Sequence, residues 1–220
     1  MSLLQRPDVQ RWLGGYLLCR VGGSGPCFAA TFDDGPSVRN TPRLLDTLAR
    51  HGAHATFFVM AWRAKRHADL MRRMVDEGHE IGVHGELHVP AFMMPRLWLD
   101  REVRRTGEAI VAATGIAPRY YRAPFGPLWP GQAGQVRRLG LTPVLGSVYP
   151  VDPHVHDAEL IAARVLARLG PGDILILHDS SPHFDFDRTP TLEAADAILR
   201  ATATGGLKAT TISGLLASSR

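Results

Sequence analysis

Residues 27–37 read CFAATFDDGPS, an apolar run that ends in two adjacent aspartates and a turn. The run has the length and composition of a buried strand, and the Gly-Pro-Ser that follows predicts a turn. Asp33 and Asp34 therefore stand at the C-terminal end of the predicted strand. Neighbouring carboxylates repel each other, so this pair either consists of ordinary turn residues or has two tasks, one binding a cation and the other accepting a proton.

Similar apolar runs alternate with helix-like segments along the chain. Helical periodicity is visible over residues 41–51, 158–170 and 191–201, with Thr-Pro at or before the start or Gly at the end. The apolar runs cover residues 27–32, 54–60, 79–84, 119–124, 142–148, 173–178 and 207–212. This alternation predicts an α/β fold with a parallel sheet, either open and doubly wound or closed as a barrel.

The composition is typical of one globular domain. Of the 220 residues, 45% are hydrophobic and 21% charged, and no apolar run approaches the roughly 18 residues of a transmembrane segment. Cys19 and Cys27 have no metal-site spacing and imply no disulfide framework. The formal charge of +4 comes from arginines scattered over predicted helix faces, which indicates a solvated surface and not a nucleic-acid site. These arginines are Arg63, Arg66, Arg72, Arg73, Arg101, Arg104 and Arg105.

Residues 1–26 are expected to form a helical extension that precedes the main domain, residues 27–220. The extension carries an amphipathic stripe that predicts a helix packed on the domain, with docking on a membrane surface as the alternative. Glycines interrupt its apolar stretch and favour a helix over a signal peptide, so we expect a cytoplasmic protein. The stripe consists of Val9, Trp12, Leu13, Tyr16 and Leu17.

In either architecture, functional side chains gather at the C-terminal ends of the strands. His84 and His88 are four residues apart, so one helical turn would place both imidazoles on one face. With Asp34 they complete a His-His-carboxylate set that leaves an open coordination position, which is typical of a catalytic metal site. The titratable residues at the predicted strand ends are Asp33, Asp34, His84, His88, Arg122, Asp152, His178 and Asp179.

Four motifs follow one another along the chain at predicted strand ends, TFDDGPS (31–37), HGELH (84–88), RAPFG (122–126) and ILILHD (174–179). In this order they resemble the polysaccharide deacetylase domain, also called the NodB-homology domain, of carbohydrate esterase family 4. The resemblance implies a deformed, TIM-like (β/α) barrel of about seven βα units. It also implies a metal-dependent hydrolase that removes acetyl groups from saccharides, most often from N-acetylglucosamine units.

The same resemblance implies a role for each residue. Asp34, His84 and His88 would bind a divalent metal, commonly Zn²⁺, with Co²⁺, Ni²⁺ and Mn²⁺ as alternatives. Asp33 would be the general base and His178 the general acid. Arg122 would hold Asp33, and Asp152 would orient His178.

Elementary chemistry adds two candidates for substrate contacts. Hydrolysis of an acetamide creates an oxyanion, and the backbone N–H of Phe125, directly after Pro124, is a candidate donor to it. Strand alternation places Ile174 and Ile176 on the same side as His178. Ile176 therefore either forms the floor of a pocket for the acetyl methyl group or belongs to the core.

The sequence departs from the family pattern at three places. Gly85 stands where Ser or Thr usually follows the first histidine, Phe125 replaces a usual Tyr, and residues 148–157 lack the usual Trp, which changes the predicted wall of the substrate site. Two other functions stay open, a metal-independent hydrolase of cyclic amides or ureides resembling the allantoinases, and a non-catalytic saccharide-binding module. The remaining histidines are expected at the surface or in the core, with His183 also a candidate for the substrate rim; they are His51, His54, His67, His79, His154, His156 and His183.

Overall fold

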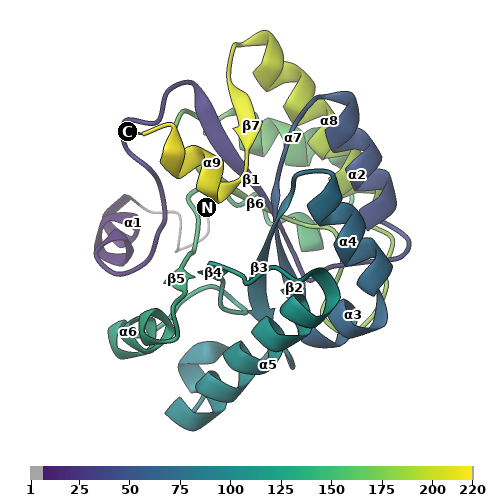
Figure 1. Ribbon diagram of the computed structural model, residues 1–220. Helices are drawn as coiled ribbons and strands as arrows, with labels where there is room; N and C mark the ends of the chain where they lie inside the picture. The colour runs from purple at the N-terminus through teal and green to yellow at the C-terminus, as the bar shows by residue number, and fades with distance from the viewer. Residues whose placement is uncertain (1–6, 220) are drawn as a thin grey trace.

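A parallel sheet of seven strands forms the centre of the protein (Figure 1). The structure is a computed structural model and describes residues 7–219. The strands lie side by side in the order β5-β4-β3-β2-β1-β6, and β7 pairs with the start of β1. Their bounds are β1 Cys27–Asp33, β2 Thr56–Met60, β3 Glu80–Gly85, β4 Tyr120–Tyr121, β5 Thr142–Pro143, β6 Ile174–His178 and β7 Lys208–Thr210. The predicted α/β fold with a parallel sheet is confirmed.

The sheet is curled, and the chain after β5 crosses to its opposite edge. Val148 forms a parallel bridge with Leu175 of β6, and Ile176 donates its backbone N–H to the carbonyl of Val148 at 2.8 Å. The segment that precedes β1 also contributes a bridge, from Leu18 to Val144. These contacts link the two edges of the sheet, so the predicted deformed barrel, and not the open sheet, is the architecture.

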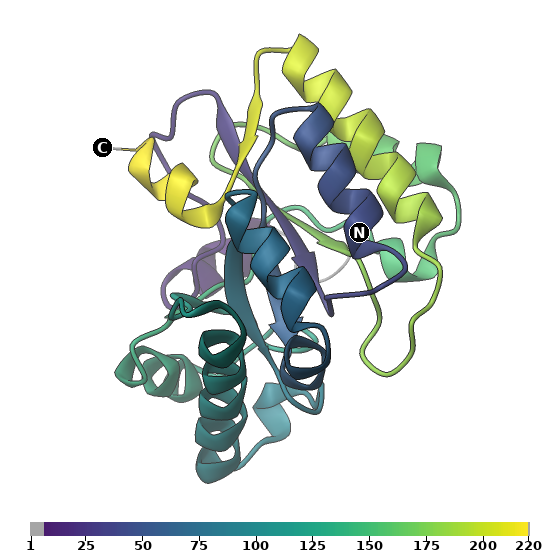
Figure 2. The same ribbon diagram turned by 45° about the vertical axis from the view of Figure 1, so that its right-hand side comes forward.

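Helices cover the outside of this sheet, apart from the C-terminal helix, which packs on its inner face (Figures 1 and 2). Strand alternation explains the packing, because Phe28 and Phe32 of β1 point outward into the main core with Leu44 and Leu48 of α2, while Ala29 belongs to a smaller interior cluster. The helices that follow the first strand are α2 Thr41–Arg50, α3 Ala61–Arg66, α4 Ala68–Asp76, α5 Arg96–Thr114, α6 Pro130–Arg138, α7 Ala158–Leu166, α8 Thr189–Thr204 and α9 Ile212–Ala217, with short 3₁₀ turns η2 Ala91–Met93 and η3 Asp152–His154.

The N-terminal segment packs on the domain through part of the predicted stripe. A helix, α1, covers Pro7–Gly14, and the buried Leu13 and Leu17 belong to the main core. The prediction that Trp12 packs on the domain with the rest of the stripe is wrong, because its side chain is 59% exposed and its ring contacts that of Tyr16 edge-on. The helix ends at Gly14, so Leu17 reaches the core from the turn beyond it. Residues 1–6 of the predicted extension lie outside the described residues.

Two further expectations need correction. The runs 119–124 and 142–148 give only two-residue strands, and in the second run Pro143 has no N–H to donate and Gly146 adopts φ 112°. Arg63 does not lie on a solvated helix face, since its exposed fraction is 1%. None of the helices between residues 7 and 219 is long and apolar enough to span a bilayer.

Candidate active site

The two adjacent aspartates stand where β1 turns into the loop that precedes α2. Asp34 adopts φ 74°, which ends the strand alternation. A Cβ atom at Gly35 would lie 2.5 Å from Oδ1 of the buried Asp179, so the close approach requires glycine. Ser37 Oγ then accepts the backbone N–H of Asn40 at 3.0 Å. These contacts fix the turn that carries both carboxylates.

Asp34, His84 and His88 converge on one point. The Nε2 atoms of His84 and His88 lie 3.3 and 3.2 Å from Asp34 Oδ1, and the three potential ligand atoms lie within 4.8 Å of one another. The structure thus brings the three predicted ligands together, but the expected helical turn is wrong. His84 and Gly85 end β3 and His88 lies in the loop after it, with positive φ angles of 136° at Gly85 and 50° at His88.

This donor set fits a divalent cation. Two ligands about 2.1 Å from a tetrahedral ion are roughly 3.4 Å apart, close to the distances found here. Asp34 Oδ1 is buried and has no hydrogen-bond donor among the described residues. His84 donates its Nδ1–H to the carbonyl of Arg122 at 2.9 Å, which leaves the Nε2 lone pair directed at Asp34.

Asp33 lies against a buried guanidinium. Arg122 Nη1 donates to Asp33 Oδ1 at 2.7 Å and to Thr31 Oγ1 at 2.6 Å, and its guanidinium carbon lies 4.2 Å from the centre of the Phe58 ring. A buried carboxylate needs such a partner to stay charged. The predicted pairing of Asp33 with Arg122 is therefore present, and it leaves Asp33 directed at the same space as the metal ligands.

On the other side of β1, His178 ends β6 and contacts Asp152. The β1–β6 register places Asp33 level with His178. Asp152 Oδ1 lies 3.0 Å from His178 Nδ1, and its Oδ2 accepts the backbone N–H of His178 at 2.9 Å and the hydroxyl of Thr191 at 3.2 Å. Burial lowers the pKa of His178, but the Asp152 carboxylate more than compensates and raises the pKa to about 9. Because Asp152 contacts Nδ1, the N–H at Nε2 of protonated His178 is the one available for proton donation.

A pocket of about 1010 Å³ opens at the C-terminal ends of the strands and joins these groups. Phe125 lines it, with φ 63° and its ring 4.9 Å from that of His88, and Ile176 lines it as predicted from strand alternation. His183 also lines the pocket, in agreement with its candidate place on the rim. The roles of Phe125 and Ile176 in contacting substrate stay predictions.

Some lining residues escaped the sequence reasoning. Tyr149, whose ring lies 5.8 Å from that of His178, occupies the wall next to the predicted acid, and burial raises its pKa. His154 and His156 line the pocket as well and were expected only at the surface or in the core. The signal for all three was their closeness in sequence to Asp152, in the stretch YPVDPHVH.

The family model described as Polysaccharide deacetylase matches residues 20–144. The chain belongs to the polysaccharide deacetylase family. Among curated relatives of this polysaccharide deacetylase, the chitooligosaccharide deacetylase of Sinorhizobium fredii is 38% identical over 165 residues, which cover 74% of this chain and 76% of the relative. The peptidoglycan-N-acetylglucosamine deacetylase of Bacillus cereus is 29% identical over 192 residues, 87% of this chain and 69% of the relative.

Solved structures place this polysaccharide deacetylase in the same fold. The Bc1960 peptidoglycan N-acetylglucosamine deacetylase superimposes with a TM-score of 0.87 at 27% identity, covering 94% of this chain and 95% of the neighbour. The neighbour and this chain share the deformed TIM-like barrel. The family membership expected from the four motifs is thus confirmed, and it supports a divalent metal at Asp34, His84 and His88.

Proposed function

We propose that this polysaccharide deacetylase removes acetyl groups from N-acetylglucosamine units of a saccharide, with Zn²⁺ as its metal. The observation that carries the proposal is one pocket lined by the Asp34-His84-His88 set, the Asp33–Arg122 pair and His178, which the buried Asp152 contacts from behind the pocket wall. Relatives that act on chitooligosaccharides and on peptidoglycan N-acetylglucosamine support the substrate class.

Each group has a place in the hydrolysis. A divalent cation held by Asp34, His84 and His88 would polarise the acetamide carbonyl and activate a water molecule. Asp33, held by Arg122, accepts a proton from that water, and His178 donates a proton from Nε2 to the departing amine. The backbone N–H of Phe125 donates to the oxyanion. Ile176 contacts the acetyl methyl group.

His88→Ala tests the metal site directly. Because His88 is proposed to supply one of three protein ligands, the variant should lose bound metal and nearly all turnover. Metal content of the purified protein, measured by mass spectrometry, is read together with acetate release from an acetylated chito-oligosaccharide. His54→Ala, which changes a histidine outside the pocket, is the control. Full metal occupancy in His88→Ala would show that the ligand set is wrong.

The same assays separate the two other functions considered from the sequence. A metal-independent hydrolase of cyclic amides would hold no stoichiometric metal, and the intact Asp34, His84 and His88 speak against it. A saccharide-binding module would bind the oligosaccharide without releasing acetate, and the presence of Asp33 and His178 at the pocket speaks against that. The cytoplasmic location stays a prediction from the sequence.

A further inference from the structure

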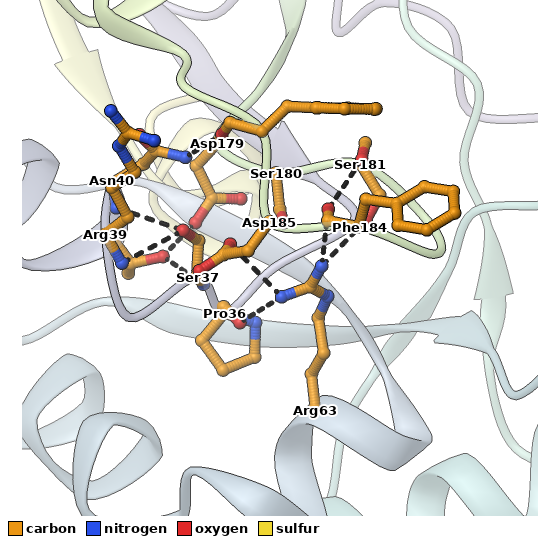
Figure 3. Close-up of polar contacts among 12 residues, drawn as sticks. Pro36, Ser37, Arg39, Asn40, Arg63, Asp179, Ser180, Ser181, Phe184 and Asp185 are labelled. Atoms are coloured by element: carbon orange, nitrogen blue, oxygen red, sulfur yellow. Dashed lines mark hydrogen bonds and ion pairs between the residues drawn. The ribbon is translucent and has the colours of Figure 1, made fainter.

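One wall of the pocket is a loop that a buried arginine holds in place. We call residues 181–187, which lie between β6 and α8, the rim loop; in Figure 2 it is the yellow-green loop that projects before α8. Arg63 of α3 donates to the carbonyls of Ser181 and Phe184 at 2.9 Å each (Figure 3). It also reaches the carbonyl of Pro36 at 3.2 Å and Asp185 Oδ1 at 3.4 Å.

A second buried side chain holds the end of the rim loop. Asn40, which is fully buried, donates its Nδ2–H to the carbonyl of Phe186 at 2.7 Å and accepts the backbone N–H of Arg188 at 3.1 Å. Arg188 in turn donates from Nε to the carbonyl of Ser180 at 2.9 Å. The loop backbone is therefore fixed from both ends although it contains no helix or strand.

Aromatic side chains lie on the open side of this fixed backbone. Phe184 and Phe186 are 64% and 58% exposed, and their ring centres are 5.6 Å apart. Phe186 and His183 line the same pocket as His178. Exposed aromatic side chains on a fixed backbone next to a ligand pocket indicate a binding surface, because their apolar area faces solvent and does not stabilise the fold by packing in the core.

We propose that the rim loop binds a second sugar ring, adjacent to the ring that carries the reacting acetamide. The inference rests on the proposed function and extends it to oligosaccharide substrates. The faces of a pyranose ring present C–H groups that pack on an aromatic ring, while its hydroxyls remain at the edge for polar partners such as His183. Phe186, with Phe184 behind it, supplies the aromatic surface, and Arg63 is a positioning residue that determines where this surface lies.

Phe186→Ala is the first test. The variant loses the stacking contact between the Phe186 ring and the second sugar ring. If this contact contributes as much as a pair of aromatic side chains, its loss should raise KM for triacetylchitotriose roughly five- to tenfold. Acetate release is measured on triacetylchitotriose and on an aryl acetate without a sugar ring. The ratio of kcat/KM for the trisaccharide to kcat/KM for the aryl acetate should fall by the same factor. Phe92→Ala is the matched control, because Phe92 is exposed in η2 and lies outside the pocket; it should keep the wild-type ratio.

Arg63→Lys tests the positioning role. An ammonium group lacks the planar fork that serves the carbonyls of Ser181, Phe184 and Pro36 together. The ratio of kcat/KM for the trisaccharide to kcat/KM for the aryl acetate should therefore fall. The cause should be a rise in KM for the trisaccharide, while kcat changes much less. A fall in kcat by the same factor on both substrates would mean a structural role only and would overturn the positioning role. If the variant does not fold, Phe186→Ala decides the proposal alone.

The outcomes distinguish the inference from the proposed function. If the wild-type protein with bound metal releases no acetate from any acetylated saccharide, the proposed function fails. If it releases acetate and Phe186→Ala keeps the wild-type ratio of kcat/KM, the rim loop does not bind a second ring and the inference alone is overturned.

Discussion

Asp152 determines the protonation state of the proposed general acid. Its carboxylate contacts both Nδ1 and the backbone N–H of His178, and the pKa of His178 rises to about 9 against the effect of burial. His178 is therefore protonated below that pH and loses its proton as the pH rises through it. Turnover that depends on this proton declines on the alkaline side.

In Asp152→Asn the negative charge is absent, so the pKa of His178 should fall. The alkaline limb of the kcat profile should then move to lower pH, while the acid limb stays in place. The measurement is kcat from pH 5 to 10 on variant protein whose circular dichroism matches the wild type. An alkaline limb that does not move would remove Asp152 from the catalytic machinery and leave it as a turn residue.

Asp33→Asn separates base catalysis from metal binding. The amide keeps the size of the side chain but cannot accept the proton of the attacking water. Turnover should fall by roughly 10²- to 10⁴-fold, typical of a lost general acid or base, while the metal content stays at the wild-type value. An unchanged rate would assign the base to another residue, and a lost metal would mean that Asp33 is a ligand.

The place of a residue could be predicted from the sequence when it followed from a local pattern, and not when it depended on contacts with residues far away along the chain. Asp33, Asp34, His84 and His178 end or follow predicted strands, so the rule that parallel strands bring their C-terminal ends together was enough to group them. Arg63 shows the opposite case. Its charge and its helix predict a solvated side chain, but its partners Ser181 and Phe184 come more than a hundred residues later, and no local pattern contains that pairing.

At the scale of elements, the connection from β1 to α2 is the most constrained. The site of a Cβ at Gly35 is occupied by the Asp179 carboxylate, which Thr41 of α2 also contacts through its hydroxyl. Burial raises the pKa of Asp179 to about 7. One short turn thus carries both adjacent carboxylates, Asp33 and Asp34, and packs on the segment after β6.

Gly35→Ala should therefore destabilise the protein. The added methyl group would meet the Asp179 oxygens at 2.5 Å, and overpacking of this kind costs about 1–3 kcal/mol in the free energy of unfolding. Urea unfolding followed by tryptophan fluorescence measures the change. Gly22→Ala is the control, because a Cβ there has open space around it, and it should stay close to the wild type. Equal stability of the two variants would show that the turn can move away from Asp179.

The elements that sequence patterns predicted least well were β4 and β5. Their apolar runs are as long as the others, but the chain leaves the ladder after two residues in each case. After β5 it instead crosses to β6, where Val148 pairs with Leu175. That pairing depends on the curvature of the whole sheet, and the places of Tyr149, His154 and His156 in the pocket depend on it in turn.

For the molecule as a whole, the N-terminal segment belongs to the packing of the barrel. Leu13 is buried in the main core, so Leu13→Ala should lower the free energy of unfolding by about 2–5 kcal/mol. The neighbouring Trp12 is largely exposed, and Trp12→Ala should change it by no more than about 0.5 kcal/mol. Urea unfolding compares the two. If Leu13→Ala unfolds like the wild type, the segment is an appendage of the barrel and not part of its core.

The rim loop and the groups that hold it come from three separate parts of the chain, with Asn40 before α2, Arg63 in α3 and the loop itself after β6. Anyone who transplants this loop into another member of the family to change its preference for saccharide length has to move three pieces of sequence. A graft of residues 181–187 alone would carry the aromatic side chains and leave behind the arginine and the asparagine that give them their place.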